Sequence, residues 1–227
     1  KILVCISHVP DTTSKINFSD DNAKFDTNGV QFVINPNDEF GLTRAMWFKE
    51  KQGAQVTVAN VGGAETEALA IGADEAIRVN TTATDGFSVA KQLASVINNG
   101  GFDLVIAGRE SIDYNGGMVP GMIAGLISAN FVNNCIGLEV DGTSATAIRE
   151  IDGGKETVST SLPLVIGGQK GLVEESDLRI PNMRGIMAAR TKPLNVVAAQ
   201  EIENLTEFVS YALPNAKSAV KMIDPEN

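Results

Sequence analysis

The feature that most constrains the fold of this chain is a set of short apolar segments separated by helical patterns. The segment FDLVIAG (102–108) is apolar almost throughout, which is typical of a strand covered on both faces of its sheet. Further strands are predicted at 1–7, 31–34, 55–61 and 76–79, and helices at 35–52, 64–72 and 85–99. This alternation predicts βαβ units, and hence an α/β fold with a mostly parallel sheet flanked by helices.

The pattern changes after about Gly125. The following segments are shorter strands with turn signals between them, such as the GLEVDG and EIDGGKETV stretches. We expect them to add to the sheet or to form an appended antiparallel part. The C-terminal stretch LPNAKSAVKMIDPEN has the composition of an extended tail.

A glycine-rich loop, GRESIDYNGGMVPGMIAG (108–125), joins the 102–108 strand to a helical pattern. Ligands of open parallel sheets bind at the carboxyl ends of the strands, which is where this loop lies. Asn115-Gly116-Gly117 allows main-chain N–H groups to approach a ligand closely. The next helix adds unpaired N–H groups and the positive end of its dipole. The loop therefore favours an anion, usually a phosphate.

Other loops should meet this one at the same sheet edge, namely those at 5–8, 35–39 and 61–63. Together they would form a crevice of mononucleotide size. The alternative is that NGG is only a tight turn, since the loop matches neither GxGxxG nor a P-loop. Asp113 would repel a phosphate if it pointed inward, so we expect it to cap the turn or to bond a ribose.

Composition excludes several classes of partner. The formal net charge is −10, and the one basic cluster, Arg184, Arg190 and Lys192, is modest, so nucleic acid is not expected. The longest nearly apolar run, 118–129, contains Gly and Pro and is too short to cross a bilayer. Two cysteines without a CxxC motif, and no signal peptide before the first strand, favour a cytoplasmic location, or the mitochondrial matrix in a eukaryote.

The residues for a self-contained active site are missing. His8 is the only histidine, so a multi-histidine metal site is excluded. A Ser-His-Asp triad would have to use His8. Because His8 ends an apolar strand, we expect a structural role or a place at the rim of the crevice. Asp20-Asp21 and Glu174-Glu175 lie in polar segments and are expected to be solvated. The chain is therefore expected to bind a ligand rather than to act alone as an enzyme.

Several motifs, in order along the chain, resemble the electron transfer flavoprotein beta subunit. The most specific is the EIDGG signature, Arg149–Glu156, followed by a strand and LPLVI (162–166). The segments KILVCISHVPDT, INPNDEFGL, AIGADEAIRV, GRESID and IPNMRGIMAARTKP are similar to that family in the same order. The resemblance covers roughly residues 1–195.

The resemblance implies a Rossmann-like, adenine-nucleotide-binding α/β fold. It also implies a heterodimer with an alpha subunit that holds most of an FAD, while the beta subunit buries a structural AMP. Residues 1–195 would form one domain, and 196–227 an extension that contacts the partner subunit. By position in the family, the AMP would be held by Cys5, Ser7, Asn35, Asn37, Asp38, Val61, Asp113, Asn115, Gly116, Gly117, Met118, Val119, Pro120 and Gly121.

This chain departs from the family in that loop. Many members have a glutamine where Met118 stands and a glycine where Pro120 stands, and a thioether cannot replace an amide hydrogen bond. A second hypothesis follows from electron-bifurcating members, which bind a second FAD in place of AMP. Their GDTAQVGP-like run is DYNGGMVP here, which favours AMP. A third hypothesis is a nucleotide-binding module of the universal-stress type, and the EIDGG signature argues against it.

The second implied functional element is a recognition loop at 171–190. In the family an exposed aliphatic residue of this loop anchors the partner dehydrogenase, and it corresponds to Ile180, with Pro181, Asn182 and Met183 beside it. From the residues alone, Ile180 packing on a helix that starts at Pro181 is the alternative. The family role is electron transport from flavin dehydrogenases, such as acyl-CoA dehydrogenases, to a quinone-linked oxidoreductase.

Overall fold

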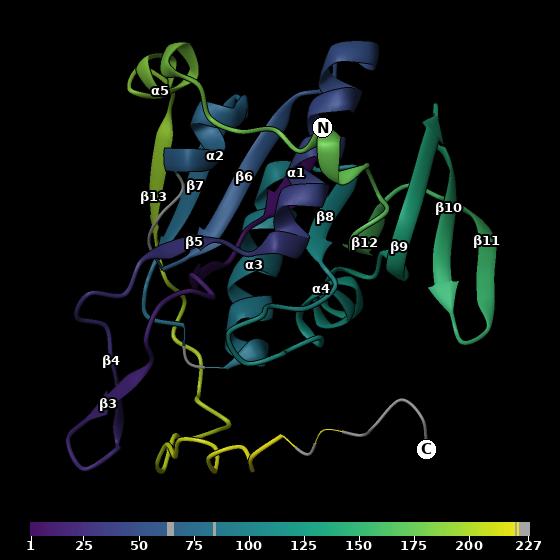
Figure 1. Ribbon diagram of the computed structural model, residues 1–227. Coiled ribbons are helices and arrows are strands. Elements are labelled where there is room, and N and C mark those ends of the chain that lie inside the picture. Colours follow the sequence, from purple (N-terminus) through teal and green to yellow (C-terminus); the bar gives the residue numbers. More distant parts are fainter. Residues whose placement is uncertain (63–65, 84, 221, 223–227) are drawn as a thin grey trace.

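A computed structural model describes residues 1–62, 66–83, 85–220 and 222 of the chain. Its main element is a nine-stranded sheet with the order β11-β10-β9-β12-β8-β1-β6-β7-β13 (Figure 1). Six strands run parallel, and β9 pairs in parallel with β12 and antiparallel with β10. The parallel strands are β1 (Ile2–Cys5), β6 (Val56–Val61), β7 (Glu75–Asn80), β8 (Leu104–Gly108), β12 (Leu164–Gly168) and β13 (Leu194–Ala198).

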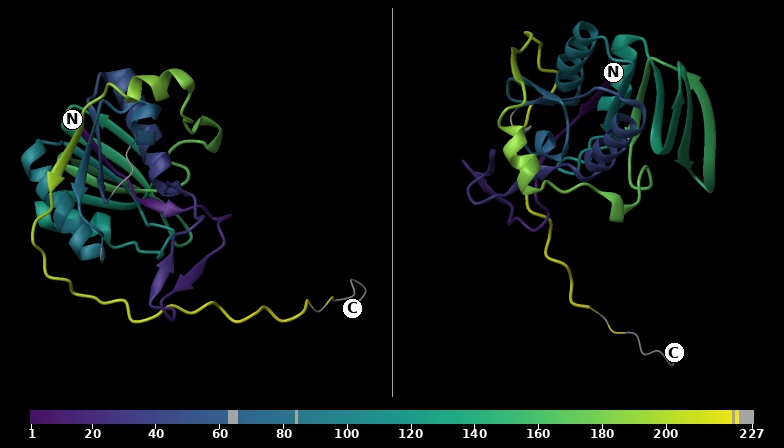
Figure 2. Two further views of the ribbon diagram at one scale, coloured as in Figure 1. Left: turned by 90° about the vertical axis from the view of Figure 1, so that its left-hand side faces the viewer. Right: turned by 90° about the horizontal axis from the view of Figure 1, so that it is seen from above.

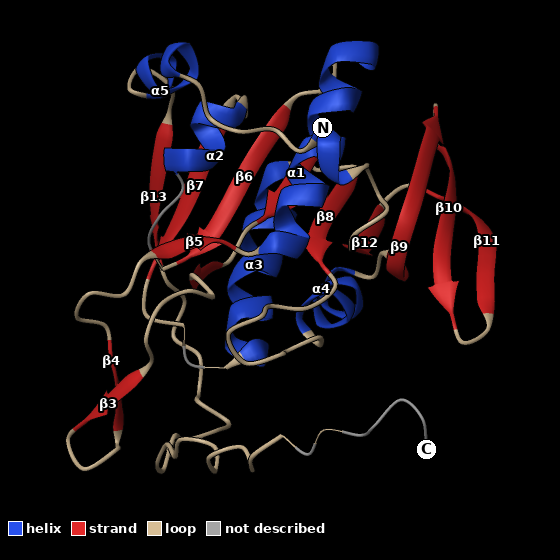
Figure 3. Cartoon of the chain, in the orientation of Figure 1, coloured by secondary structure: helices blue, strands red, loops and turns tan. Residues whose placement is uncertain are grey.

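The appended antiparallel part is also present. It consists of β9 (Asn130–Asp141), β10 (Ser144–Ile151) and β11 (Gly154–Ser161), which project from one edge of the parallel sheet (Figure 3). Two short antiparallel pairs stand apart from the main sheet: β2 (His8–Pro10) with β5 (Phe32–Ile34), and β3 (Asn17–Ser19) with β4 (Lys24–Asp26). The predicted strand at 31–34 therefore exists but does not join the main sheet.

Helices cover both faces of the parallel sheet, as the continuous apolar strands predicted. Ile2, Val4 and Ile6 point into the core beneath one set of helices, whereas Leu3 and Cys5 point to the other face. The first set is α1 (Pro36–Gln52), α2 (Thr66–Ile71) and α5 (Met183–Ala189), and the second is α3 (Gly86–Gly100) and α4 (Val119–Ile127) (Figure 2). A short 3₁₀ helix spans Glu175–Asp177.

The helix ends follow the sequence signals. α1 begins after Asn35 and ends at Gly53, which has φ 70° and needs the left-handed conformation that glycine adopts without strain. α3 begins after Asp85, whose side chain accepts a hydrogen bond from Ser88 N at 2.7 Å in a capping box. Within the described ranges, no helix is long and apolar enough to cross a membrane.

The chain reverses its direction of travel across the sheet between β1 and β8. From β1 it proceeds through β6 to β7, and then returns to the other side of β1 to form β8 and later β12. At such a reversal the loops after neighbouring strands diverge and leave a crevice. β13 pairs with β7 at one edge of the sheet. This strand spans residue 195, the predicted boundary between the domain and its C-terminal extension.

Candidate functional site

A cleft of about 560 Å³ lies at the carboxyl ends of the parallel strands, where β1 and β8 diverge. Three helices begin beside it, because Asn35, Asp85 and Met118, the residues that precede α1, α3 and α4, all line it. The positive ends of three helix dipoles therefore converge on one cavity. A smaller hollow of about 310 Å³ lies between α3 and β13, away from this edge.

Most residues of the predicted ligand set are brought together in this cleft. Asn37, Asn115, Gly117 and Gly121 belong to the same loops but do not line it. The residues of the set that line it are Cys5, Ser7, Asn35, Asp38, Val61, Asp113, Gly116, Met118, Val119 and Pro120.

Other residues that line the cleft were not predicted from the sequence. Two of them could have been predicted. Asn60 is a polar residue near the end of an apolar strand, and Asp85 directly precedes a helix. Tyr114 lies inside the predicted loop but was not assigned to the site. Thr206 and Phe208 come from the C-terminal segment, and nothing in their local pattern places them here.

Asp38 holds the diverging strands together. Its side chain is buried, and one carboxylate oxygen accepts a hydrogen bond from Ser7 N at 2.7 Å while the other accepts one from Gly108 N at 2.7 Å. Ser7 follows β1 and Gly108 ends β8, so a single carboxylate joins the two strand ends. Gly108 must be glycine here, because a Cβ would overlap Asp38 Oδ1.

Burial raises the pKa of the Asp38 carboxyl to about 7, and the nearby Glu39 adds to this effect. The hydrogen bonds from Ser7, Asn35 and Gly108 act in the opposite direction. Asp38 lies in the first turn of α1 together with Glu39, and it also organises the cleft.

The start of α1 holds the glycine-rich loop in place. The side-chain amides of Asn35 and Asn37 both donate to Glu110 O, at 2.9 and 3.2 Å, and Asn35 Oδ1 accepts from Ile112 N at 3.3 Å. Asn35 directly precedes α1, but its side chain makes no capping hydrogen bond there. These two asparagines therefore position the loop.

The loop itself is closed by short-range hydrogen bonds. Ser111 N donates to Gly116 O at 3.1 Å, and Asp113 accepts from the Ser111 hydroxyl at 2.6 Å and from Tyr114 N at 2.9 Å. Asp113 thus caps the turn, as expected. Asn115 has φ 52°, in the left-handed region that asparagine tolerates better than most residues.

Asn60 presents an unused acceptor in the cleft wall. Its side-chain amide donates to Ile6 O at 2.9 Å, while its buried Oδ1 has no hydrogen-bond partner in the described part of the chain. Cys5, Val61, Val89 and Leu93 provide apolar surface in the same cleft. Burial raises the pKa of the Cys5 thiol, and the nearby Asp38 raises it further, so this free cysteine is a neutral wall residue.

The lining is rich in carboxylates. Asp38, Asp85, Glu110 and Asp113 line the cleft, and its described lining contains no Lys or Arg. An anion would therefore be held by main-chain N–H groups at the start of α4. Pro120 is in the first turn of that helix and has no N–H, which leaves fewer donors than a proline-free helix would offer.

The predicted docking loop is exposed. Ile180 is 83% exposed, so the interpretation that it packs on the following helix is wrong. That helix, α5, begins at Met183 rather than Pro181, and the Asn182 side chain caps it by accepting from Gly185 N at 2.8 Å. Met183 and Met187, one turn apart on α5, are also exposed.

The residues that the structure describes contain no group of three or more His, Cys, Asp or Glu side chains able to hold a metal ion. His8 lies at the rim of the cleft with its ring 5.2 Å from that of Phe32.

These features define the class of protein: an α/β protein with a ligand cleft at the reversal point of a parallel sheet. The electron transfer flavoprotein domain model matches residues 23–202. An electron transfer flavoprotein subunit beta of Syntrophomonas wolfei is 36% identical, with 100% of this chain and 90% of that protein covered. The Bacillus subtilis subunit beta is 32% identical (99% and 88% covered), and that of Dictyostelium discoideum 31% (100% and 94%). The chain belongs to the electron transfer flavoprotein beta subunit family.

The role of Asp38 makes a stability prediction. Asp38→Asn should lower the free energy of unfolding by about 1–3 kcal/mol at pH 5, because the new amide nitrogen cannot accept the N–H that it would face. The folded state keeps the Asp38 proton to about pH 7, whereas the unfolded chain loses it near pH 4. The stability of the original chain relative to the variant should therefore fall as pH rises from 5 through 7. Urea denaturation across this range measures both effects.

Asp74→Asn is the matched control. Asp74 also accepts a main-chain N–H, from Val56 at 2.9 Å, but despite partial burial the Lys49 ammonium and that N–H hold its pKa below the usual value. Its loss should cost the same at pH 5 and pH 8. An Asp38→Asn penalty that stays constant or grows over this range would show that Asp38 is ionised throughout.

Proposed function

We propose that this chain is the beta subunit of a heterodimeric electron transfer flavoprotein, and that its cleft binds AMP. The observation that carries the proposal is the cleft at the carboxyl ends of β1, β6 and β8, where the starts of α1, α3 and α4 converge. The adjacent alpha subunit would hold most of an FAD, which supplies the electron-transfer chemistry. This chain would complete the wall around that FAD.

The cleft suits the parts of AMP unequally. The unpartnered Asn60 Oδ1 is an acceptor for the exocyclic amino group of adenine, and Cys5, Val61 and Leu93 offer apolar surface to the base. Hydroxyl groups of the ribose are donors, which suits the carboxylates of the lining. The phosphate would lie against the main-chain N–H groups of the Gly116–Gly121 stretch and the start of α4.

The Met118 and Pro120 departures bear on the phosphate alone. Met118 is exposed and contributes no hydrogen-bond donor, and Pro120 removes a main-chain donor. Phosphate binding in this chain would therefore rely on the path of the loop, which Asn35 and Asn37 fix through Glu110 O.

The chain would act as a carrier subunit and not as an enzyme on its own. Electrons would enter the FAD from dehydrogenases, such as acyl-CoA dehydrogenases, and leave to a quinone-linked oxidoreductase. This would take place in the cytoplasm of a bacterium or in the mitochondrial matrix of a eukaryote. The exposed Ile180 with Met183 would contact the dehydrogenase. A transient contact of this kind is consistent with one aliphatic anchor, whose burial contributes about 1.5–3 kcal/mol.

Cofactor content tests the proposal. The heterodimer, purified with its alpha subunit and then denatured, should release one FAD and one AMP, because one cleft of this chain holds one nucleotide. Chromatography with absorbance detection quantifies both. Two FAD and no AMP would assign the cleft to a second flavin and make electron bifurcation the mechanism. FAD without any second nucleotide would contradict nucleotide binding by this cleft.

The docking role of Ile180 has a separate test. Ile180→Ala should slow flavin reduction by a dehydrogenase about ten-fold, since removing a buried aliphatic anchor costs roughly 1.5 kcal/mol or more, while FAD content stays the same. Stopped-flow absorbance follows the reduction. Val209→Ala is the control, because Val209 is also 83% exposed but lies on the C-terminal segment. Equal rates in the two variants would remove the docking role.

A further inference from the structure

The C-terminal segment returns across the mouth of the cleft. After β13 the chain runs along the carboxyl-end edge of the sheet and passes below α3 and the glycine-rich loop (Figure 1). We call residues 199–213 the C-terminal strap. Thr206 and Phe208 of the strap line the same cleft as Cys5, Asp38 and Asn60.

The first part of the strap is fixed to α3. Gln92 and Gln200 form a reciprocal pair: Gln92 Nε2 donates to Gln200 O at 2.8 Å, and Gln200 N donates to Gln92 Oε1 at 3.0 Å. Gln92 is buried, so this pair is shielded from water. The Gln200 side chain also donates to Ser95 Oγ at 2.8 Å.

Asp85 links the strap to the cleft wall. One of its carboxylate oxygens caps α3, and the other accepts from Leu205 N and from the Thr206 hydroxyl, both at 3.3 Å. The same side chain lines the cleft. The strap is therefore joined to a helix N-terminus that already forms part of the site.

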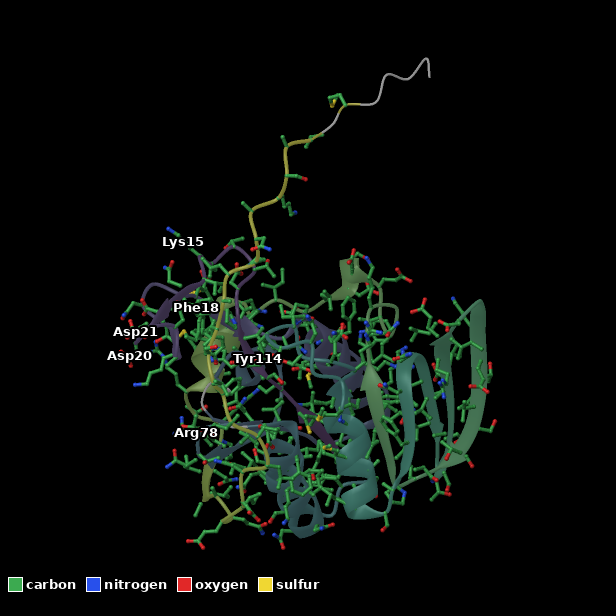
Figure 4. All side chains as sticks on the ribbon, turned by 90° about the horizontal axis from the view of Figure 1, so that it is seen from below. Lys15, Phe18, Asp20, Asp21, Arg78 and Tyr114 are labelled. Carbon is green, nitrogen blue, oxygen red and sulfur yellow. The ribbon has the colours of Figure 1, made fainter. Side chains whose placement is uncertain are left out.

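The far part of the strap is held by aromatic contacts. Phe208 lies between Tyr114 of the glycine-rich loop (ring centroids 5.5 Å apart) and Tyr211 (5.7 Å), and Tyr211 stacks on Phe18 of β3 at 4.9 Å. Tyr211 N also donates to Asn22 O in the β3–β4 turn at 2.8 Å. Seen from below, Phe18 and Tyr114 lie beside the strap (Figure 4).

The strap is attached but weakly buried. Its residues 203–210 are all exposed, and Phe208 itself remains 54% exposed in spite of its two ring partners. A segment held by a few polar bonds and ring contacts, with little buried apolar surface, opens at a lower free energy than the core. It can therefore detach while the domain stays folded.

From this geometry we propose that the C-terminal strap is the outer wall of the nucleotide site, with Thr206 and Phe208 in contact with the bound nucleotide. The Phe208 ring offers a planar apolar surface to a base, and the Thr206 hydroxyl a polar contact. Because the strap crosses the mouth, the nucleotide leaves only after the strap detaches. The proposal rests on the proposed function, since it takes an adenine nucleotide as the ligand.

The test uses the intact heterodimer, with a fluorescent N-methylanthraniloyl derivative of AMP as the probe. Phe208→Ala should speed release of the probe about ten-fold, because it removes the aromatic ring that faces the nucleotide. Val209→Ala removes the neighbouring exposed side chain, which does not line the cleft, and should leave the rate within about two-fold.

The outcomes separate the two proposals. Equal release rates from the Phe208→Ala and Val209→Ala proteins would overturn the strap proposal while leaving the nucleotide site intact. Loss of the alpha subunit from the Phe208→Ala protein, with probe release unchanged in the dimer that remains, would assign the strap to the subunit interface and also overturn it. Failure of the unmodified heterodimer to bind the probe would contradict the proposed function itself.

Discussion

The Asp38 carboxylate, shared between the main-chain N–H groups of Ser7 and Gly108, is the interaction on which the site depends. β1 and β8 are adjacent in the sheet, but the loops after them diverge because the chain reverses direction there. Two strand ends with unpaired amides would be costly to bury without an acceptor. A single buried carboxylate satisfies both and leaves the space above it open as the cleft. The short approach also explains why Gly108 carries no side chain.

The electrostatics of the cleft follow from the same arrangement. A carboxylate at a helix start is favourable where helix dipoles converge, so Asp85, whose pKa is held low by its bond with Ser88 N, stabilises the α3 start while it lines the cavity. In the proposed AMP complex, main-chain donors at the α4 start would face the phosphate, and Asn60 Oδ1 would accept from the adenine amino group. A ligand with an aromatic amine at one end and an anion at the other matches this distribution of donors and acceptors.

Sequence patterns predicted the fold because strand and helix periodicity are local properties. The predicted strand at 102–108 and the predicted helices at 35–52 and 85–99 all correspond to observed elements. Side-chain roles that depend on distant partners were not predictable in the same way. Asn35 and Asn37 were predicted to contact a ligand, and their bonds to Glu110 O, 75 and 73 residues away, were not predicted. Phe208 reaches the cleft because the strap folds back over it. This return also brings Tyr211 beside Tyr114, which is 97 residues away in the sequence. Local pattern carries no information on such contacts.

The measurement that tests the account most directly is hydrogen–deuterium exchange of the heterodimer, with its cleft emptied and then saturated with AMP. The account predicts that AMP slows exchange in peptides that contain Ser7, Asn60–Gly62 and Ser111–Gly121, because these main-chain segments surround the cleft. Exchange in β10 and β11 should not change, because β9 and β12 separate these strands from β8 and β1 in the sheet. Unchanged exchange at the three cleft segments, or protection confined to β10 and β11, would contradict a nucleotide site at the point where β1 and β8 diverge.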